Sequence, residues 1–271
     1  MIAIYGGTGF IGSKFVKKYD CFVVPREQIN PPEGTTKVLY MISTVDNYNV
    51  LNDPFIDIET NLIHLMKVLE CIKDRQIEFT FISSWFVYGD TGLPATETSC
   101  CNPKGFYSIT KRTAEQLLES YCKTFNIDYK IVRLSNVVGK GDGKVSKKKN
   151  ALQYLIEEMR SGRDINLYHG GNFYRDIIHV EDAVDGIKFV MDKGVPREIY
   201  NLGSGSKPVL FKDIINYLHH ELSSSSKIGS MEPTDFHKIV QVESMYLEVS
   251  KLTSLGFKPS KTVFQSIHEL I

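Results

Sequence analysis

The chain has 271 residues, of which 42% are hydrophobic and 24% charged, and its 32 basic side chains balance 32 acidic ones. This composition is typical of a globular protein and excludes a disordered, collagen-like or low-complexity chain. The zero net charge argues against nucleic acid as the main partner. No apolar run approaches the roughly 20 residues that a membrane span requires, so we expect no membrane association.

The five cysteines are odd in number and match no metal-ligand spacing. They stand at positions 21, 71, 100, 101 and 122. A glycine-rich turn already begins at Gly6, which is too early for a signal peptide to precede it. We therefore expect reduced thiols, a cytoplasmic location and no metal site.

Five short apolar runs predict β-strands that are buried on both faces, as in a parallel sheet. The runs are residues 1–5, 21–24, 38–42, 79–82 and 129–132. Two stretches with apolar residues at helical spacing, 61–72 and 107–125, predict helices between them. The alternation of strands and helices indicates an α/β fold with a doubly wound parallel sheet.

The connection between the second and third predicted strands is unusual. Only about ten residues separate Arg26 from Lys37, and they include Pro31 and Pro32. This segment is too short and too rich in proline for a crossover helix. We expect a bare loop in its place.

The first predicted strand runs into the sequence GGTGFIG at residues 6–12. Gly6, Gly9 and Gly12 suit a tight strand-to-helix turn that lets a pyrophosphate approach the backbone. The N-terminus of the following helix offers unpaired N–H groups to that pyrophosphate. The motif and its position predict a dinucleotide site.

The end of the second predicted strand bears on which dinucleotide is bound. An Asp or Glu there holds the ribose 2′-hydroxyl of NAD, whereas an Arg accommodates the 2′-phosphate of NADP. The first charged side chain here is Arg26, and Glu27 follows it. We therefore favour NADP(H) over NAD(H), while Glu27 keeps NAD open.

A serine pair and a tyrosine–lysine pair provide candidate catalytic groups. Ser83 and Ser84 follow the fourth predicted strand, and Tyr107 and Lys111 lie four residues apart on one helical face. A nearby ammonium lowers the pKa of a phenol, and a serine hydroxyl can donate to a carbonyl oxygen. Together these groups suit hydride chemistry at an alcohol or ketone carbon.

In this order, the motifs resemble the extended short-chain dehydrogenase/reductase family, in its group of nucleotide-sugar epimerases, dehydratases and reductases. The resemblance covers nearly the whole chain. The matching segments are GGTGFIG at 6–12, SSWFVYG at 83–89, YSITK at 107–111, VRLSNVVG at 132–139, YRDIIHVEDAVDGI at 174–187, YNLGSG at 200–205 and KLTSLGFKPS at 251–260.

The resemblance implies a role for each matching residue. Ser84, Tyr107 and Lys111 match the catalytic serine, the general acid–base and its lysine partner. Ser84, Asn136 and Arg175 match positions that bind the nucleotide-sugar substrate, the last two at its diphosphate. Together with Arg26, the implied cofactor-binding residues are Gly6, Thr8, Gly9, Phe10, Ile11, Gly12, Asn61, Ser83, Tyr107 and Lys111. Asn61 would support the site from the helix after the third strand.

The resemblance also implies an overall organisation. A Rossmann-type NAD(P)-binding domain would span residues 1–165, and segments at about 174–205 would return to it. Residues 206–271 would form most of a small substrate-binding domain. The predicted helices 61–72 and 107–125 would carry the interface of a homodimer.

Departures from the family pattern narrow the expected reaction. Dehydratases of this group carry an Asp-Glu pair after the serine or threonine, whereas this chain has Trp85 and Phe86, which cannot transfer protons. Enzymes that epimerise two carbons before reducing use a cysteine and a downstream histidine that do not match here. Dehydration and double epimerisation are therefore disfavoured.

Three functions remain. The favoured one is NAD(P)H-dependent reduction of a nucleotide-linked 4-keto-6-deoxy sugar, because the chain is short, the loop after the second strand is trimmed and Arg26 suits NADPH. The alternative is an NAD-dependent C4 epimerase of nucleotide sugars. A redox-silent sensor of a dinucleotide is a third hypothesis, although it would need no proton donor. The four lysines between residues 144 and 149 could form a lid over the diphosphate or a plain solvated loop.

Overall fold

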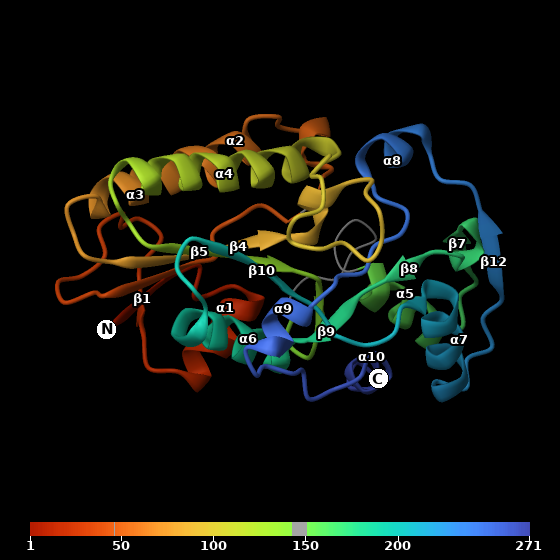
Figure 1. Cartoon of the computed structure of the whole chain (residues 1–271). Helices are drawn as coiled ribbons and strands as arrows, with labels where there is room; N and C mark the ends of the chain where they lie inside the picture. Colours follow the sequence, from red (N-terminus) through yellow and green to blue (C-terminus); the bar gives the residue numbers. More distant parts are fainter. Residues whose placement is uncertain (46, 143–150) are drawn as a thin grey trace.

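The computed structural model describes residues 1–45, 47–142 and 151–271, so the lysine-rich segment 144–149 lies outside the described residues. At its centre is a six-stranded sheet with the strand order β10-β5-β4-β3-β1-β2, in which each neighbouring pair runs parallel (Figure 1). Its strands are β1 Ile2–Tyr5, β2 Phe22–Val23, β3 Lys37–Tyr40, β4 Glu78–Ser84, β5 Tyr129–Leu134 and β10 Glu198–Leu202. The α/β fold with a Rossmann-type parallel sheet is confirmed.

Helices cover both faces of the sheet and bury their apolar stripes against it. The helices α3 His64–Ile72 and α4 Gly105–Thr124 pack on one face, and α1 Phe10–Lys18 and α6 Val180–Lys193 pack on the other (Figure 1). In α3 the fully buried side chains recur at helical spacing. They are Leu65, Val68, Leu69 and Ile72. No helix among the described residues is long and apolar enough to cross a membrane.

The connection between β2 and β3 is a loop without a helix, as the prolines predict. The Arg75 guanidinium donates to the carbonyl oxygens of Pro31 and Pro32 at 3.0 and 2.8 Å. The Tyr5 hydroxyl donates to the Ile29 carbonyl oxygen at 2.5 Å. These bonds fix the loop against β1 and the end of α3 in place of a crossover helix.

The helix predicted at 61–72 begins earlier and is irregular. It consists of α2 Ile56–Ile58, the π-helical turn η2 Glu59–Ile63 and α3. A π-turn contains one residue more than an α-turn, so apolar spacing alone did not reveal it. Asn61 lies in this turn and is buried.

Most of the remaining elements form a smaller lobe beside the sheet. Three two-stranded sheets pair β6 Asn136–Val138 with β9 Ile177–His179, β7 Ile165–Tyr168 with β12 Ile228–Met231, and β8 Tyr174–Arg175 with β11 Val209–Leu210. The lobe also contains α5 Ala151–Arg160, α7 Phe211–Glu221 and α10 Val263–His268, which share a core cluster. Shorter helices are η1 Asn49–Leu51, η3 Trp85–Tyr88, η4 His169–Gly171, α8 Asp235–Val240 and α9 Ser250–Ser254. The domain boundary near residue 165 stays a prediction.

Candidate active site

A large cavity of about 1840 Å³ runs from the carboxyl ends of the sheet strands into the smaller lobe. Open parallel sheets bind ligands at this edge, because the loops that follow the strands meet there. On the sheet side the cavity is lined by the segments 6–12, 23–26, 41–45, 82–86 and 134–138. On the other side it is lined by Tyr168, Phe173, Phe211, Met231 and His237, among others.

The glycine turn between β1 and α1 forms one end of this cavity. Gly6 has a φ of +85°, and a Cβ on Gly12 would lie 2.2 Å from the Gly6 carbonyl oxygen. Gly9 precedes α1, whose first turn has no side-chain cap, and Thr8, Phe10 and Ile11 also line the cavity. Free helix N–H groups and a side-chain-free turn fit the pyrophosphate of a dinucleotide.

Arg26 lies on the wall next to this turn. It is exposed, it follows β2, and it lines the cavity together with Val24 and Pro25. Glu27 is exposed and is not among the lining residues. Of the two charged residues that bear on cofactor choice, the structure therefore brings Arg26 to the cavity.

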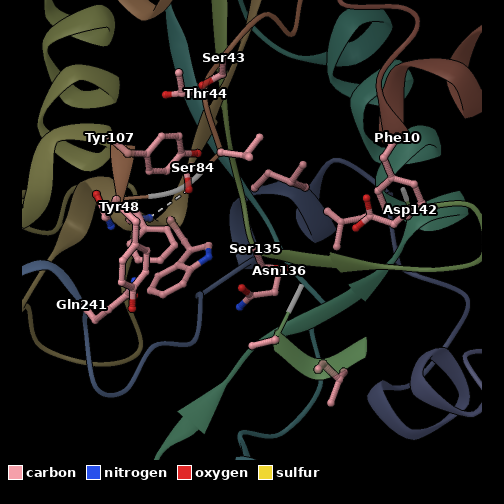
Figure 2. A pocket seen from close by; sticks show the side chains of 18 of the residues that line it. Phe10, Ser43, Thr44, Tyr48, Ser84, Tyr107, Ser135, Asn136, Asp142 and Gln241 are labelled. Atoms are coloured by element: carbon pink, nitrogen blue, oxygen red, sulfur yellow. Dashed lines mark hydrogen bonds between the residues drawn. The ribbon is translucent and has the colours of Figure 1, made fainter. Parts of the chain in front are cut away.

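Ser84 and Tyr107 both line the cavity and lie beside each other (Figure 2). Ser84 is the last residue of β4, and its Oγ accepts a hydrogen bond from the Phe86 backbone N–H at 3.3 Å. Tyr107 lies in the first turn of α4, and it lines the cavity together with Ser84 and Ser43. Burial raises the pKa of Tyr107, whereas the nearby Ser84 and Ser43 side chains oppose that rise.

Lys111 lies one helical turn beyond Tyr107 and is buried. Its Nζ donates to the Ile82 carbonyl oxygen at 2.6 Å and lies 4.1 Å from the centre of the Phe81 ring. Burial lowers the pKa of Lys111 to about 7, and the Glu115 carboxylate opposes this shift. The sequence led us to expect an ammonium that lowers the Tyr107 pKa. That expectation is wrong here, because burial dominates and raises it.

A buried ion pair below Lys111 was not predicted from the sequence. The Arg133 Nε and Nη2 atoms donate to the two Glu115 carboxylate oxygens at 3.0 and 2.8 Å, and both residues are fully buried. Arg112 adds a third donor to Glu115 at 2.7 Å. The sequence did contain a signal for this pair. Arg133 lies in a buried strand, and a buried arginine requires a charged partner.

Asn61 lies behind the cavity rather than on its wall. Its Oδ1 accepts from the Thr44 N–H at 2.9 Å and from the Ser43 hydroxyl at 3.1 Å. Its Nδ2 donates to the Thr44 and Thr110 hydroxyls, both at 2.9 Å. All four hydrogen-bonding positions of the amide are thus used by the protein. Asn61 holds the end of β3 against α4, and this placement supports a positioning role rather than cofactor contact.

Asn136 and Arg175, which were predicted to bind the substrate, both line the cavity. The Asn136 Nδ2 donates to the Asp176 carbonyl oxygen at 3.0 Å. The Arg175 guanidinium packs on the Phe173 ring at 4.5 Å and donates to the Val242 carbonyl oxygen at 3.0 Å. Burial lowers the pKa of Arg175 to about 10. Arg175 therefore also anchors the segment that crosses the cavity after α8.

Several cavity residues carried no recognisable sequence signal. Ser83 was predicted and does line the cavity, but Ser43 and Tyr48 from the loop after β3 were not predicted. The segment from Pro233 to Glu243 also contributes, and His237 within it contacts the Tyr48 hydroxyl through Nδ1 at 3.0 Å. These residues reach the site through long-range folding and follow no local motif.

Comparison with known proteins shows the family of this chain. The model of the "NAD dependent epimerase/dehydratase family" matches residues 31–203. A putative UDP-glucose 4-epimerase of Methanocaldococcus jannaschii is 25% identical over 309 aligned residues, which cover 100% of this chain and 97% of the relative. A dTDP-4-dehydro-6-deoxyglucose reductase of Escherichia coli is 23% identical over 186 residues, which cover 68% of this chain and 57% of the relative.

Two solved structures share the fold over almost the whole chain. The UDP-glucose 4-epimerase of Thermotoga maritima with UDP-glucose has a TM-score of 0.85 at 21% identity, covering 99% of this chain and 96% of that one. RMD of Pseudomonas aeruginosa, complexed with NADPH, has a TM-score of 0.83 at 20% identity, covering 99% and 97%. Because the family model matches more than half of the chain, the protein belongs to the NAD-dependent epimerase/dehydratase family of extended short-chain dehydrogenases/reductases and is an NAD(P)-dependent enzyme of that family.

Proposed function

We propose that the enzyme reduces a nucleotide-linked 4-keto sugar, specifically a 4-keto-6-deoxy sugar, with NADPH. The observation that carries the proposal is the meeting of Ser84 and Tyr107 in one cavity, with Tyr107 favoured in its protonated form. A protonated phenol is the form that can donate to a newly formed alkoxide. An oxidation, by contrast, would have to begin from the phenolate.

The roles of the side chains follow from their positions. A bound NADPH would supply the hydride to the keto carbon. Tyr107 would donate its proton to the oxygen that becomes negative, and the Ser84 hydroxyl would hydrogen-bond the same oxygen. Lys111 would take up positive charge when Tyr107 becomes a phenolate, since its pKa of about 7 lets it gain a proton near neutral pH.

The residues after Ser84 oppose dehydration. The Trp85 and Phe86 rings stack with their centres 3.9 Å apart, and the edge of Phe86 meets Tyr107 at 5.9 Å. Neither side chain can protonate a leaving hydroxyl or remove a proton from carbon. The proposed proton transfer therefore uses Tyr107, Ser84 and Lys111, which all line the cavity.

The preference for NADPH rests on Arg26. Its place on the cavity wall after β2 suits the 2′-phosphate, and a guanidinium is well matched to phosphate. The structurally similar RMD of Pseudomonas aeruginosa was solved with NADPH.

The second candidate is a C4 epimerase of nucleotide sugars. The putative UDP-glucose 4-epimerase of Methanocaldococcus jannaschii, which matches this chain along its whole length, favours it. Both functions would use Ser84, Tyr107 and Lys111. They differ in outcome, because an epimerase regenerates its cofactor and a reductase consumes it.

Nicotinamide absorbance distinguishes the two functions. Purified protein is mixed with NADPH and with uridine-, thymidine- or guanosine-diphosphate-linked 4-keto-6-deoxy sugars, and the assay is repeated with NADH. We expect one ketone to consume NADPH stoichiometrically, and Tyr107→Phe to slow that reaction at least about 100-fold. If no ketone consumes either cofactor while C4 epimers interconvert with catalytic NAD, the reductase proposal fails and the epimerase replaces it.

A further inference from the structure

His64 is a polar residue on the cavity wall that has no part in the proposed reduction so far. It begins α3 directly after the π-helical turn η2, and it lines the cavity together with Arg26. Its Nδ1 lies 2.9 Å from the Tyr40 hydroxyl oxygen. Its other ring nitrogen, Nε2, is shielded from solvent and has no hydrogen-bond partner among the described residues. A buried polar atom without a partner costs stability, so its presence requires an explanation.

The Tyr40 hydroxyl determines which nitrogen of His64 carries the hydrogen. Tyr40 is fully buried, and three aromatic rings lie around it with centres 5.8 to 6.1 Å away, those of Tyr5, Phe79 and Phe81. Burial raises the pKa of Tyr40, so the hydroxyl keeps its hydrogen, and the structure places the His64 Nδ1 within its reach as an acceptor. A neutral imidazole holds one hydrogen, and if Nδ1 accepts, that hydrogen lies on Nε2. The Nε2–H group of His64 is therefore a donor without an acceptor.

The loop that carries Arg26 lies on the same face of the sheet as His64. Tyr5 ends β1 and Tyr40 ends β3, and the two residues are paired in register with their ring centres 5.8 Å apart. The Tyr5 hydroxyl holds the Ile29 carbonyl oxygen of the loop, as the Tyr40 hydroxyl holds His64. The two segments also contribute to the same core cluster. Arg26 and His64 therefore reach the cavity from neighbouring segments at the carboxyl edge of the sheet.

The charges near His64 favour an anionic ligand. Lys67 lies one helical turn beyond His64 on α3, and Arg26 follows β2. Burial lowers the pKa of His64, and the positive charges of Lys67 and Arg26 lower it further, so the imidazole is neutral above pH 7. A phosphate group offers three acceptor oxygens, and a guanidinium that binds two of them leaves the third for another donor.

Resting on the proposed use of NADPH, we propose that His64 recognises the 2′-phosphate together with Arg26, its Nε2–H group donating to a phosphate oxygen. The contact requires a small turn of the imidazole toward the cavity, which the Tyr40 hydroxyl can follow by rotating its O–H bond. Arg26 supplies the charge, and His64 supplies a directed hydrogen bond. Because the donor has no partner in the protein, its pairing with the phosphate adds selectivity over a dinucleotide that carries only the ribose hydroxyl.

The binding of two adenosine nucleotides tests the contact without turnover. Adenosine 2′,5′-bisphosphate carries the 2′-phosphate and adenosine 5′-monophosphate lacks it, and titration calorimetry gives the Kd of each. We expect His64→Phe to weaken the bisphosphate about tenfold and the monophosphate less than about twofold. His64→Gln places an amide donor near the position of Nε2 and should keep most of the affinity.

His219→Phe is the matched control. His219 is a half-buried histidine of α7 whose Nε2 lies 2.8 Å from the Ser226 carbonyl oxygen, and it does not line the cavity. This variant should leave both Kd values unchanged. A preference for the bisphosphate that survives His64→Phe would overturn the role of His64 and leave the use of NADPH intact. Equal losses for both nucleotides would place His64 at the adenosine and also overturn the proposal. A wild-type protein without any preference would refute the use of NADPH itself.

A second measurement examines the hydrogen on the ring. In protein labelled with ¹⁵N at histidine, long-range ¹H–¹⁵N spectra distinguish the two neutral forms, and the His64 signals are identified by their absence in His64→Gln. At about pH 8 we expect the hydrogen on Nε2. The Nε2 resonance should shift when the bisphosphate is added and stay in place with the monophosphate. A hydrogen on Nδ1 would overturn the proposal, because Nε2 could then not donate.

Discussion

Lys111 is a buried lysine in the candidate active site, and the burial of its ammonium group lowers the stability of the fold. Its ammonium is enclosed by the Ile82 carbonyl and the Phe81 ring, and its pKa falls to about 7 from an ordinary value of 10.5. At pH values between about 7 and 10.5, Lys111 is protonated in the unfolded chain more than in the folded one. The free energy of unfolding therefore rises with pH across this range. Below the range, the destabilisation caused by the buried ammonium is fully present.

Lys111→Met should remove this penalty and the activity together. We expect the free energy of unfolding to increase by about 1 to 3 kcal/mol at pH 6.5, with the gain shrinking toward pH 10. Urea unfolding at several pH values measures it. Lys130→Met is a suitable contrast, because Lys130 is equally buried but pairs with Glu78 at 2.9 Å, so its loss should destabilise the fold. A Lys111→Met protein less stable than the parent at pH 6.5 would contradict the argument.

Arg26 should favour NADPH over NADH, because only NADPH carries the 2′-phosphate that the guanidinium would bind. We expect Arg26→Ala to raise KM for NADPH about tenfold and to leave KM for NADH within about twofold. Steady-state kinetics with each cofactor measure this. Glu27→Gln, one residue further and off the cavity wall, should change neither value. Equal losses for both cofactors would mean that Arg26 does not bind the 2′-phosphate.

Among the elements, the turn between β1 and α1 tolerates little change in side-chain size. A Cβ on Gly12 would meet the Gly6 carbonyl oxygen at 2.2 Å and the Gly7 Cα at 2.9 Å, and both are backbone atoms that cannot move aside. Gly12→Ala should lower stability by about 1 to 3 kcal/mol and weaken dinucleotide binding. Thermal unfolding and cofactor titration measure the two effects. Gly92→Ala, where a Cβ meets nothing within 4 Å, should leave both unchanged, and an equally mild Gly12→Ala would contradict the expected clash.

The elements also show what the sequence could and could not predict. The runs that became β1, β3, β4 and β5 were recognisable because strands buried on both faces are apolar throughout, whereas β2 is a partly exposed edge strand of two residues. The strand β10 was not recognised, since it pairs with β5 across more than 60 residues and follows no local pattern. The proposed catalytic residues were predicted from motifs, whereas the positions of Ser43 and of the Glu115–Arg133 pair depend on long-range packing. The direction of the Tyr107 pKa shift was missed because burial cannot be read from the spacing of Tyr107 and Lys111.

For the whole molecule, the resemblance implies a homodimer, and the outer face of α4 fits that expectation. Ile109 and Leu117 on α4 are exposed, and so is Ile63 at the end of η2 beside it. Exposed apolar residues that cluster on one helical layer are typical of an interface between proteins. Figure 1 shows that this layer is the outer surface of the sheet domain.

We expect the protein to be a dimer and Ile109→Glu/Leu117→Glu to be a folded monomer. Two carboxylates in an apolar interface would remain unpaired, whereas on a free face they would be solvated. Sedimentation velocity gives the mass of each form, and circular dichroism confirms that the variant is folded. A wild-type monomer, or a variant that still dimerises, would place the interface elsewhere or remove it.

The short loop between β2 and β3 should also affect how long a cofactor stays bound. With a two-residue edge strand, a loop without a helix and an exposed Arg26, this side of the dinucleotide site lies near solvent. A short residence time suits a reductant that must be exchanged after every turnover, whereas an enzyme that recycles its cofactor gains from holding it. The protein should therefore leave purification free of dinucleotide, and a tightly retained NAD in the purified sample would instead indicate a permanent prosthetic group.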